Sequence, residues 1–188
     1  MKIIRAKAVR KCLRFFKIVY DIKGPYEIIL DGNFMFTAIK LKVDIKDRLQ
    51  KLLQGEEVRL YVLRSVLVEL QQVGAKALST LEYAKSFCEV IEDSRFQGET
   101  PKDRAICMMR QQHRDWIAAS SSTPSSSSSS SSARIKRYFI ASQDRELRSA
   151  LGSTPGVPLI YLNKVTLVLE PPSSASLEFN KEVCNACV

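Results

Sequence analysis

Residues 26–31 read YEIILD, and this short stretch is the strongest indicator of the fold class. An apolar run of this length, rich in β-branched residues and followed by a helical pattern over 33–40, is typical of a buried strand. The strand ends in a carboxylate, Asp31. Residues 138–144, YFIASQD, repeat the arrangement and end in Asp144. Because carboxyl ends of parallel strands meet at one edge of a sheet, we expect Asp31 and Asp144 to lie close together.

Short β-rich runs alternate with longer helical patterns along the rest of the chain. Such alternation predicts parallel strands covered by helices on both faces. We therefore predict an α/β fold, a three-layer α/β/α sandwich around a central, mostly parallel five-stranded sheet. The other predicted strands are 58–63, 88–93 and 158–162, with 165–170 as an added edge strand, and the predicted helices are 33–40, 45–54, 64–74, 75–87, 103–114 and 145–151.

The sequence divides into a basic N-terminal arm over 1–24, the α/β domain over 25–172 and a C-terminal tail over 173–188. A nearly pure serine run interrupts the domain, and we expect a disordered insertion over 119–133, since such a run cannot bury apolar surface. The entropy of closing a loop grows slowly with its length, so the fold tolerates this insertion. We expect the tail, which contains Cys184 and Cys187, to be unstructured.

The chain is basic, with a formal net charge of +9, which favours a nucleic-acid partner. A membrane is not expected, because no apolar run approaches the roughly 18–20 residues that a spanning helix needs. The N-terminal arm is either an amphipathic helix docked on the domain or an arm that neutralises RNA phosphates, and both interpretations can hold together. The candidate RNA-binding residues of the arm are Lys2, Arg5, Lys7, Arg10, Lys11 and Arg14.

Four acidic residues are candidates for a common site at the carboxyl edge of the sheet. Converging carboxylates suit hard cations such as Mg²⁺, which take oxygen ligands and a substrate phosphate. Asp31 and Asp144 also have a structural alternative as helix N-caps, and Asp103 as an ordinary first-turn acid. Glu69 lies inside the apolar stretch VLVELQQV, where a surface role explains it less well. The candidate catalytic and metal-binding residues are Asp31, Glu69, Asp103 and Asp144.

Five segments together resemble a known family. From Met1 to about Ser174 the chain resembles the PIN-domain nucleases, and within them the nucleolar branch of rRNA-processing proteins that acts in the small-subunit processome, of the Utp-twenty-three type. The segment at 154–173 is the most specific of the five. The five segments are MKIIRAKAVRKCLRFFK, GPYEIILDGNF, ELQQVG, RYFIASQDRELR and TPGVPLIYLNKVTLVLEPPS.

The resemblance implies a PIN-like fold in which the four acids hold one or two Mg²⁺ or Mn²⁺ ions. A metal-bound water would then attack an RNA phosphate, and Arg145 would position that phosphate. It further implies pre-rRNA, small nucleolar RNA and ribosome-assembly proteins as partners, and a location in the nucleus and nucleolus. Two functions stay open: an assembly factor for ribosome biogenesis without essential catalysis, and a metal-dependent endoribonuclease.

One family feature is missing from the sequence. Proteins of this branch carry a small zinc site of three cysteines and one histidine. Here Cys88 matches the first ligand, while the next two positions fall near Asp93 and Arg95, and the last near Arg104 or Cys107. Two thiolates do not close a tetrahedral zinc site, so we predict no zinc. The five cysteines are odd in number and irregularly spaced, which argues against a disulfide framework.

Overall fold

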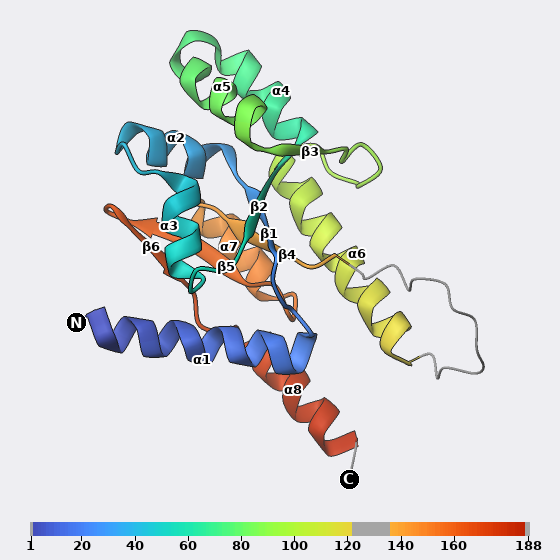
Figure 1. Ribbon diagram of the computed structural model, residues 1–188. Coiled ribbons are helices and arrows are strands. Elements are labelled where there is room, and N and C mark those ends of the chain that lie inside the picture. The colour runs from blue at the N-terminus through green and yellow to red at the C-terminus, as the bar shows by residue number, and fades with distance from the viewer. Residues whose placement is uncertain (1, 122–135, 187–188) are drawn as a thin grey trace, which may run out of the picture.

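A computed structural model describes residues 2–121 and 136–186 of the chain (Figure 1). The strands are β1 (Tyr26–Leu30), β2 (Val58–Leu63), β3 (Glu89–Ile91), β4 (Tyr138–Ala141), β5 (Leu159–Asn163) and β6 (Thr166–Leu169). The helices are α1 (Lys2–Tyr20), α2 (Gly32–Lys40), α3 (Ile45–Leu52), α4 (Arg64–Val73), the 3-10 turn η1 (Gly74–Ala77), α5 (Leu78–Phe87), α6 (Pro101–Ser121), α7 (Arg145–Gly152) and α8 (Ser174–Ala186).

The strands form one sheet in the order β3-β2-β1-β4-β5-β6. All neighbours are parallel except β5 and β6, which pair antiparallel. The sheet therefore has six strands where the prediction counted five, because the segment considered as an added edge strand pairs along its whole length with β5. The α/β class and the mostly parallel order are confirmed.

The centre of the sheet is buried on both faces. Ile28, Leu30 and Phe139 are fully buried on the central strands. In Figure 1, α2 and α3 lie on one side of the strands and α6 lies on the other. Strands covered on both faces read as continuous apolar runs rather than as alternating ones, which is why YEIIL and YFIA contain so few polar residues.

Helix α1 is packed into the domain core instead of standing apart as an arm. Its residues Leu13, Phe16 and Tyr20 are buried, and Phe16 is only 1% exposed. The rings of Phe16 and Tyr20 lie 6.2 Å apart, and the Tyr20 hydroxyl donates a hydrogen bond of 3.0 Å to the Ser176 carbonyl oxygen. The interpretation of the N-terminal segment as a docked helix therefore applies to the side of α1 that packs against the core.

The C-terminal segment forms helix α8, where we expected an unstructured tail. The Ser173 hydroxyl accepts a hydrogen bond of 3.2 Å from the Ser176 amide, as an N-cap does. Phe179 stacks on Tyr20 with 5.7 Å between ring centres and lies 5.9 Å from the Trp116 ring. These rings join α1, α6 and α8 into one cluster, which holds the helix in place.

The predicted serine-rich insertion is described only at its start. Residues 119–121 belong to the last turn of α6, and 122–133 lie outside the described residues. Within the part of the chain that the structure describes, no helix is long and apolar enough to cross a membrane.

Candidate functional site

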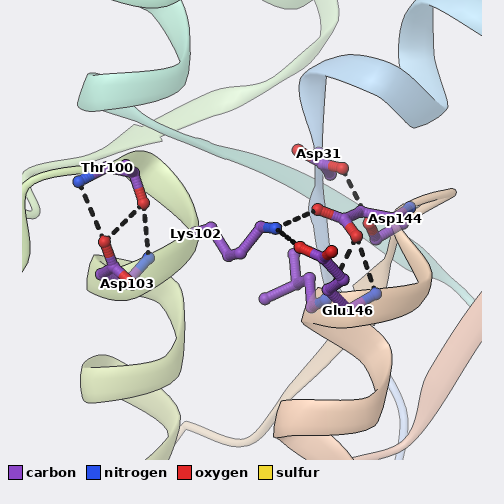
Figure 2. A network of polar contacts seen from close by, with 8 residues as sticks. Asp31, Thr100, Lys102, Asp103, Asp144 and Glu146 are labelled. Atoms are coloured by element: carbon purple, nitrogen blue, oxygen red, sulfur yellow. Dashed lines mark hydrogen bonds and ion pairs between the residues drawn. The ribbon is translucent and has the colours of Figure 1, made fainter.

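The two strand-end aspartates are linked by one buried hydroxyl. In the register of β1 and β4, Leu30 lies opposite Ala141, so the residues that follow each strand are neighbours. The Ser142 hydroxyl donates a hydrogen bond of 2.7 Å to Asp31 Oδ2 and accepts one of 3.0 Å from the Asp144 amide (Figure 2). The sheet thus brings Asp31 and Asp144 together at its carboxyl edge.

Asp31 and Asp144 have different structural roles at the starts of α2 and α7. Asp144 is a true N-cap of α7: its Oδ1 accepts hydrogen bonds from the amides of Glu146 at 2.8 Å and Leu147 at 3.3 Å. Asp31 occupies the N-cap position of α2 without the capping bonds that Asp144 makes to the second and third residues of its helix. The capping alternative therefore accounts for Asp144 and leaves the carboxylate of Asp31 without this structural role.

A lysine faces the acids. Lys102 Nζ lies 2.7 Å from Asp144 Oδ2 and 2.8 Å from Glu146 Oε2 (Figure 2). The hydrogen bonds to these two carboxylates raise the pKa of Lys102, so it stays charged. Lys102 and Ser142 were both missed in the sequence. The one available signal was the position of Ser142, which directly follows the apolar run of β4 and stands two residues before Asp144.

Asp31, Asp144 and Glu146 form the carboxylate cluster that Lys102 faces, and Asp103 turns away from it. Its Oδ2 accepts a hydrogen bond of 2.6 Å from the Thr100 hydroxyl, and its amide donates one of 3.2 Å back to that hydroxyl. Such a reciprocal pair caps the first turn of α6. Successive residues of a helix point about 100° apart, so a helix that aims Lys102 at Asp144 directs Asp103 elsewhere (Figure 2).

The pKa values of the two aspartates shift in opposite directions. Burial raises the pKa of Asp31 above its ordinary value, against the hydrogen bonds from the Ser142 hydroxyl and the Gly32 amide, and the charges of Glu69 and Asp144 raise it further. Burial also acts to raise the pKa of Asp144, but Lys102 and the two α7 amides outweigh it and lower the value. Glu69 itself is exposed on α4. The charges of Glu69 and Asp144 therefore both act on Asp31, whereas Asp103 interacts with Thr100.

The basic candidates form one exposed surface on α1. Five cations are exposed there and fall within an arc of about 120° at 100° per residue. We name this surface the basic face of α1. Side chains of Lys2 and Arg5 lie outside the described ones, and Arg145 is exposed at the start of α7. The residues of the basic face are Lys7, Arg10, Lys11, Arg14 and Lys17.

The donors as arranged do not fit a divalent cation. Both oxygens of Asp144 are engaged, one by the amides of α7 and the other by Lys102, and one oxygen of Asp31 accepts from Ser142. Among the described residues, no group of three or more Asp, Glu, His or Cys side chains could hold a metal ion. The cation that faces these acids is the ammonium of Lys102.

Comparison with known proteins settles the family. The Fcf1 family model matches residues 51–171, which is more than half of the chain. The chain belongs to the Fcf1 family. The match covers Glu69, Lys102, Asp103 and Asp144, while Asp31 and α1 precede it.

Relatives of this Fcf1-family chain are named as rRNA-processing proteins. It is 29% identical over 184 residues to rRNA-processing protein utp23 of Schizosaccharomyces pombe, covering 95% of this chain and 62% of that protein. It is 28% identical over 152 residues to the rRNA-processing protein FCF1 homolog of Mus musculus, covering 81% of this chain and 64% of that protein. The chain thus spans less than two thirds of the length of these relatives.

The fold also matches a solved PIN domain. The structure of the PIN domain endonuclease Utp24 superposes with a TM-score of 0.60 at 20% identity, covering 78% of this chain and 92% of that one. The PIN-like fold and the recognition of the family from the sequence are confirmed.

Neutralising the two aspartates should have opposite effects on stability. The raised pKa of Asp31 means that its ionised form destabilises the folded state at neutral pH, and this penalty disappears as the pH falls below the ordinary value of 3.8. Asp31→Asn should therefore raise the free energy of unfolding at pH 7. Asp144→Ala should lower it by about 1 kcal/mol through loss of the N-cap.

Urea unfolding at neutral pH and at acid pH checks both variants. The lowered pKa of Asp144 gives a contribution that is present above its unfolded-state pKa and is lost as the pH falls through the folded-state value. The stability differences between wild type and the two variants should therefore become smaller in acid. Only the capping contribution of the protonated Asp144 carboxyl should remain. Changes of the same sign at pH 7 would contradict the assignment of distinct roles.

Proposed function

We propose that this Fcf1-family protein is a nucleolar rRNA-processing factor of small-subunit assembly, which binds pre-rRNA or small nucleolar RNA without essential catalysis. The observation that carries the proposal is the basic face of α1, a row of exposed cations on a helix whose other side is fixed in the core. The names of its relatives as rRNA-processing proteins support it.

A docked helix is a suitable phosphate-binding surface. Lys7 and Lys17 lie ten residues apart, which is about 15 Å along a helix. Cations held at fixed positions on a rigid element release condensed counterions when they neutralise phosphates, and this release drives binding. Burial of Phe16 and Tyr20 fixes the direction in which these cations point.

The contacts of the acids Asp31, Asp103, Asp144 and Glu146 favour a protein that does not cleave RNA. Lys102 offsets the negative charge of Asp144 and Glu146, and Asp103 is directed to Thr100. A metal-dependent hydrolase needs carboxylate oxygens that remain available to its ions. In this arrangement, of the four candidate acids, Asp31 and the exposed Glu69 would be left as ligands for a divalent metal ion.

Removing the charge from the basic face should weaken RNA binding strongly. In a variant with Lys7, Arg10, Lys11 and Arg14 all replaced by Gln, we expect affinity for a labelled pre-rRNA fragment to fall by roughly 30-fold or more at moderate salt. The slope of log affinity against log salt should become shallower by about 3, at 0.7–0.9 per lost phosphate contact. Fluorescence anisotropy across a salt series measures both quantities.

A variant with equal charge loss elsewhere is the control. Lys40, Lys46, Arg48 and Lys51 are exposed on α2 and α3, and their replacement by Gln removes the same charge. This control should change affinity much less. Equal effects of the two variants would mean that net charge alone attracts RNA, and wild type that does not bind the fragment would end the proposal.

The alternative function is a Mg²⁺- or Mn²⁺-dependent endoribonuclease of the PIN type. The specific observation in its favour is that the charges of Glu69 and Asp144 both raise the pKa of Asp31, as expected of neighbouring acids. The same RNA fragment incubated with Mn²⁺ separates the two functions. Intact RNA supports the binding role. Cleavage that disappears in the combined Asp31→Asn and Asp144→Asn variant, with binding preserved, would establish the nuclease instead.

A further inference from the structure

A groove of about 720 Å³ lies between α6, the start of β4, and β3 with the loop that follows it. A volume of this size is within the range of sites that hold small organic ligands. Three cations line it, Arg95, Arg114 and Lys136, together with two aromatic residues, Phe96 and Tyr138. The one acid among its lining residues is Asp115. Positively charged side chains therefore outnumber acids in the groove lining, which also contains two aromatic rings.

The rings and cations of the groove are held by their neighbours. The Arg95 guanidinium lies over Phe96, 4.8 Å from the ring centre, which adds a second flat surface to the aromatic one. The Tyr138 ring packs edge-on against Tyr61 at 5.3 Å, and Lys136 Nζ lies 3.4 Å from the Tyr61 hydroxyl. Aromatic faces and guanidinium planes are the surfaces on which unpaired bases stack.

Helix α6 separates this groove from the carboxylate cluster. At about 100° per residue, Cys107, Gln111 and Arg114 lie on one side of α6, and Lys102 points to the opposite side. The first three residues line the groove, whereas Lys102 pairs with Asp144 and Glu146. A strand lying in the groove would therefore be kept away from Asp144 by the helix itself.

Lys136 connects the groove to the end of α1. It also lines a smaller pocket of about 230 Å³ next to the residues that follow α1 in the chain. That pocket contains acids as well as cations, and Lys136 Nζ lies 3.5 Å from Glu27 Oε1 there. The two hollows meet at this side chain.

We propose that this groove binds single-stranded RNA, with bases stacked on Phe96 and Tyr138 and phosphates paired with Arg95, Arg114 and Lys136. The proposal rests on the RNA-binding function and gives it a second contact surface besides the basic face of α1. Stacking recognises unpaired bases without regard to sequence. The bound segment is therefore a single-stranded region, held on the side of α6 that faces away from Asp144.

The test uses the full chain and a fluorescein-labelled oligouridylate. We expect the combined Phe96→Ala and Arg114→Gln variant to bind it at least tenfold more weakly than wild type, since stacking contributes about 1–3 kcal/mol per base. The matched control is Phe87→Ala with Arg110→Gln, which removes the same groups from exposed positions outside the groove lining. The control should stay within about twofold of wild type, as expected of groups that touch no RNA.

Two further measurements test RNA binding in the groove even if Phe96→Ala disturbs the loop that follows β3. Arg114→Gln alone, an exposed substitution on α6, should reduce the salt slope by about 1. Oligonucleotides containing 4-thiouridine should crosslink under ultraviolet light to the peptides that carry Phe96 or Tyr138. Unchanged affinity and salt slope in the groove variants, or crosslinks confined to other peptides, would overturn the inference.

The experiment also separates the groove from the function on which it rests. Loss of binding in the α1 variant, with full binding in both groove variants, refutes the groove and leaves the RNA-binding function intact. Wild type that binds neither the oligouridylate nor the pre-rRNA fragment refutes the function. Displacement of bound RNA by an acidic peptide, without any crosslink to the groove, would identify a protein segment as its occupant and count against RNA there.

Discussion

Phe16→Ala should lower the free energy of unfolding by about 3–5 kcal/mol. The side chain is 1% exposed, and its ring lies 5.5 Å from Phe15 and 6.2 Å from Tyr20. Deleting it leaves a cavity where α1 meets the core, and the neighbouring rings can fill that space only in part. The free energy is read from urea unfolding followed by circular dichroism.

Ile18→Ala on the same helix is the matched control. Ile18 is 68% exposed, and its removal should change stability by less than about 0.5 kcal/mol. If Phe16→Ala has as small an effect as Ile18→Ala, α1 is a separable arm and its cations are not held in fixed directions. The basic face would then not be presented to RNA by a rigid helix.

Lys102→Gln should make the carboxylate cluster bind Mn²⁺ about tenfold more tightly, because it removes the positive charge closest to these acids. In wild type, the ammonium lies 2.7 Å from Asp144 and 2.8 Å from Glu146, and a divalent ion would have to displace it. Loss of the free Mn²⁺ signal in electron paramagnetic resonance measures the affinity without any assay of cleavage.

A lysine in a similar pair elsewhere provides the comparison. Lys51 lies 2.7 Å from Asp47 on α3, and Lys51→Gln should leave Mn²⁺ binding at the wild-type level. The structure assigns Lys102 the role of a resident counter-ion. Equal Mn²⁺ affinities in wild type, Lys102→Gln and Lys51→Gln would contradict that role.

The strands and the meeting of Asp31 with Asp144 could be predicted because they depend on periodicity and chain direction alone. A buried strand reads as an apolar run, and parallel strands place their carboxyl ends at one edge. Neither inference needs a side-chain conformation. The sixth strand was harder to predict, since four residues with partial burial at a sheet edge give a weak pattern.

Two other features depend on tertiary contacts that a sequence does not reveal. The role of Lys102 follows from the placement of α6 beside α7. The direction of Asp103, by contrast, follows from the local Thr100 cap and agrees with the alternative of a first-turn acid. Helix α8 is fixed by the fit of Phe179 against Tyr20 and Trp116. Charged residues next to one another in a sequence look like an ordinary solvated surface, so the pairing of Lys102 with distant acids carries no local signal.

The ring cluster around Tyr20 has a practical consequence for shortening this chain. Tyr20 comes from one terminal helix, Phe179 from the other, and Trp116 from the helix between them. Trimming either terminus to obtain a smaller folded unit would strip partners from the remaining rings, and the Tyr20 hydroxyl would lose the Ser176 carbonyl. A shortened unit that keeps this ring cluster therefore has to contain both α1 and α8, although the family match covers only 51–171.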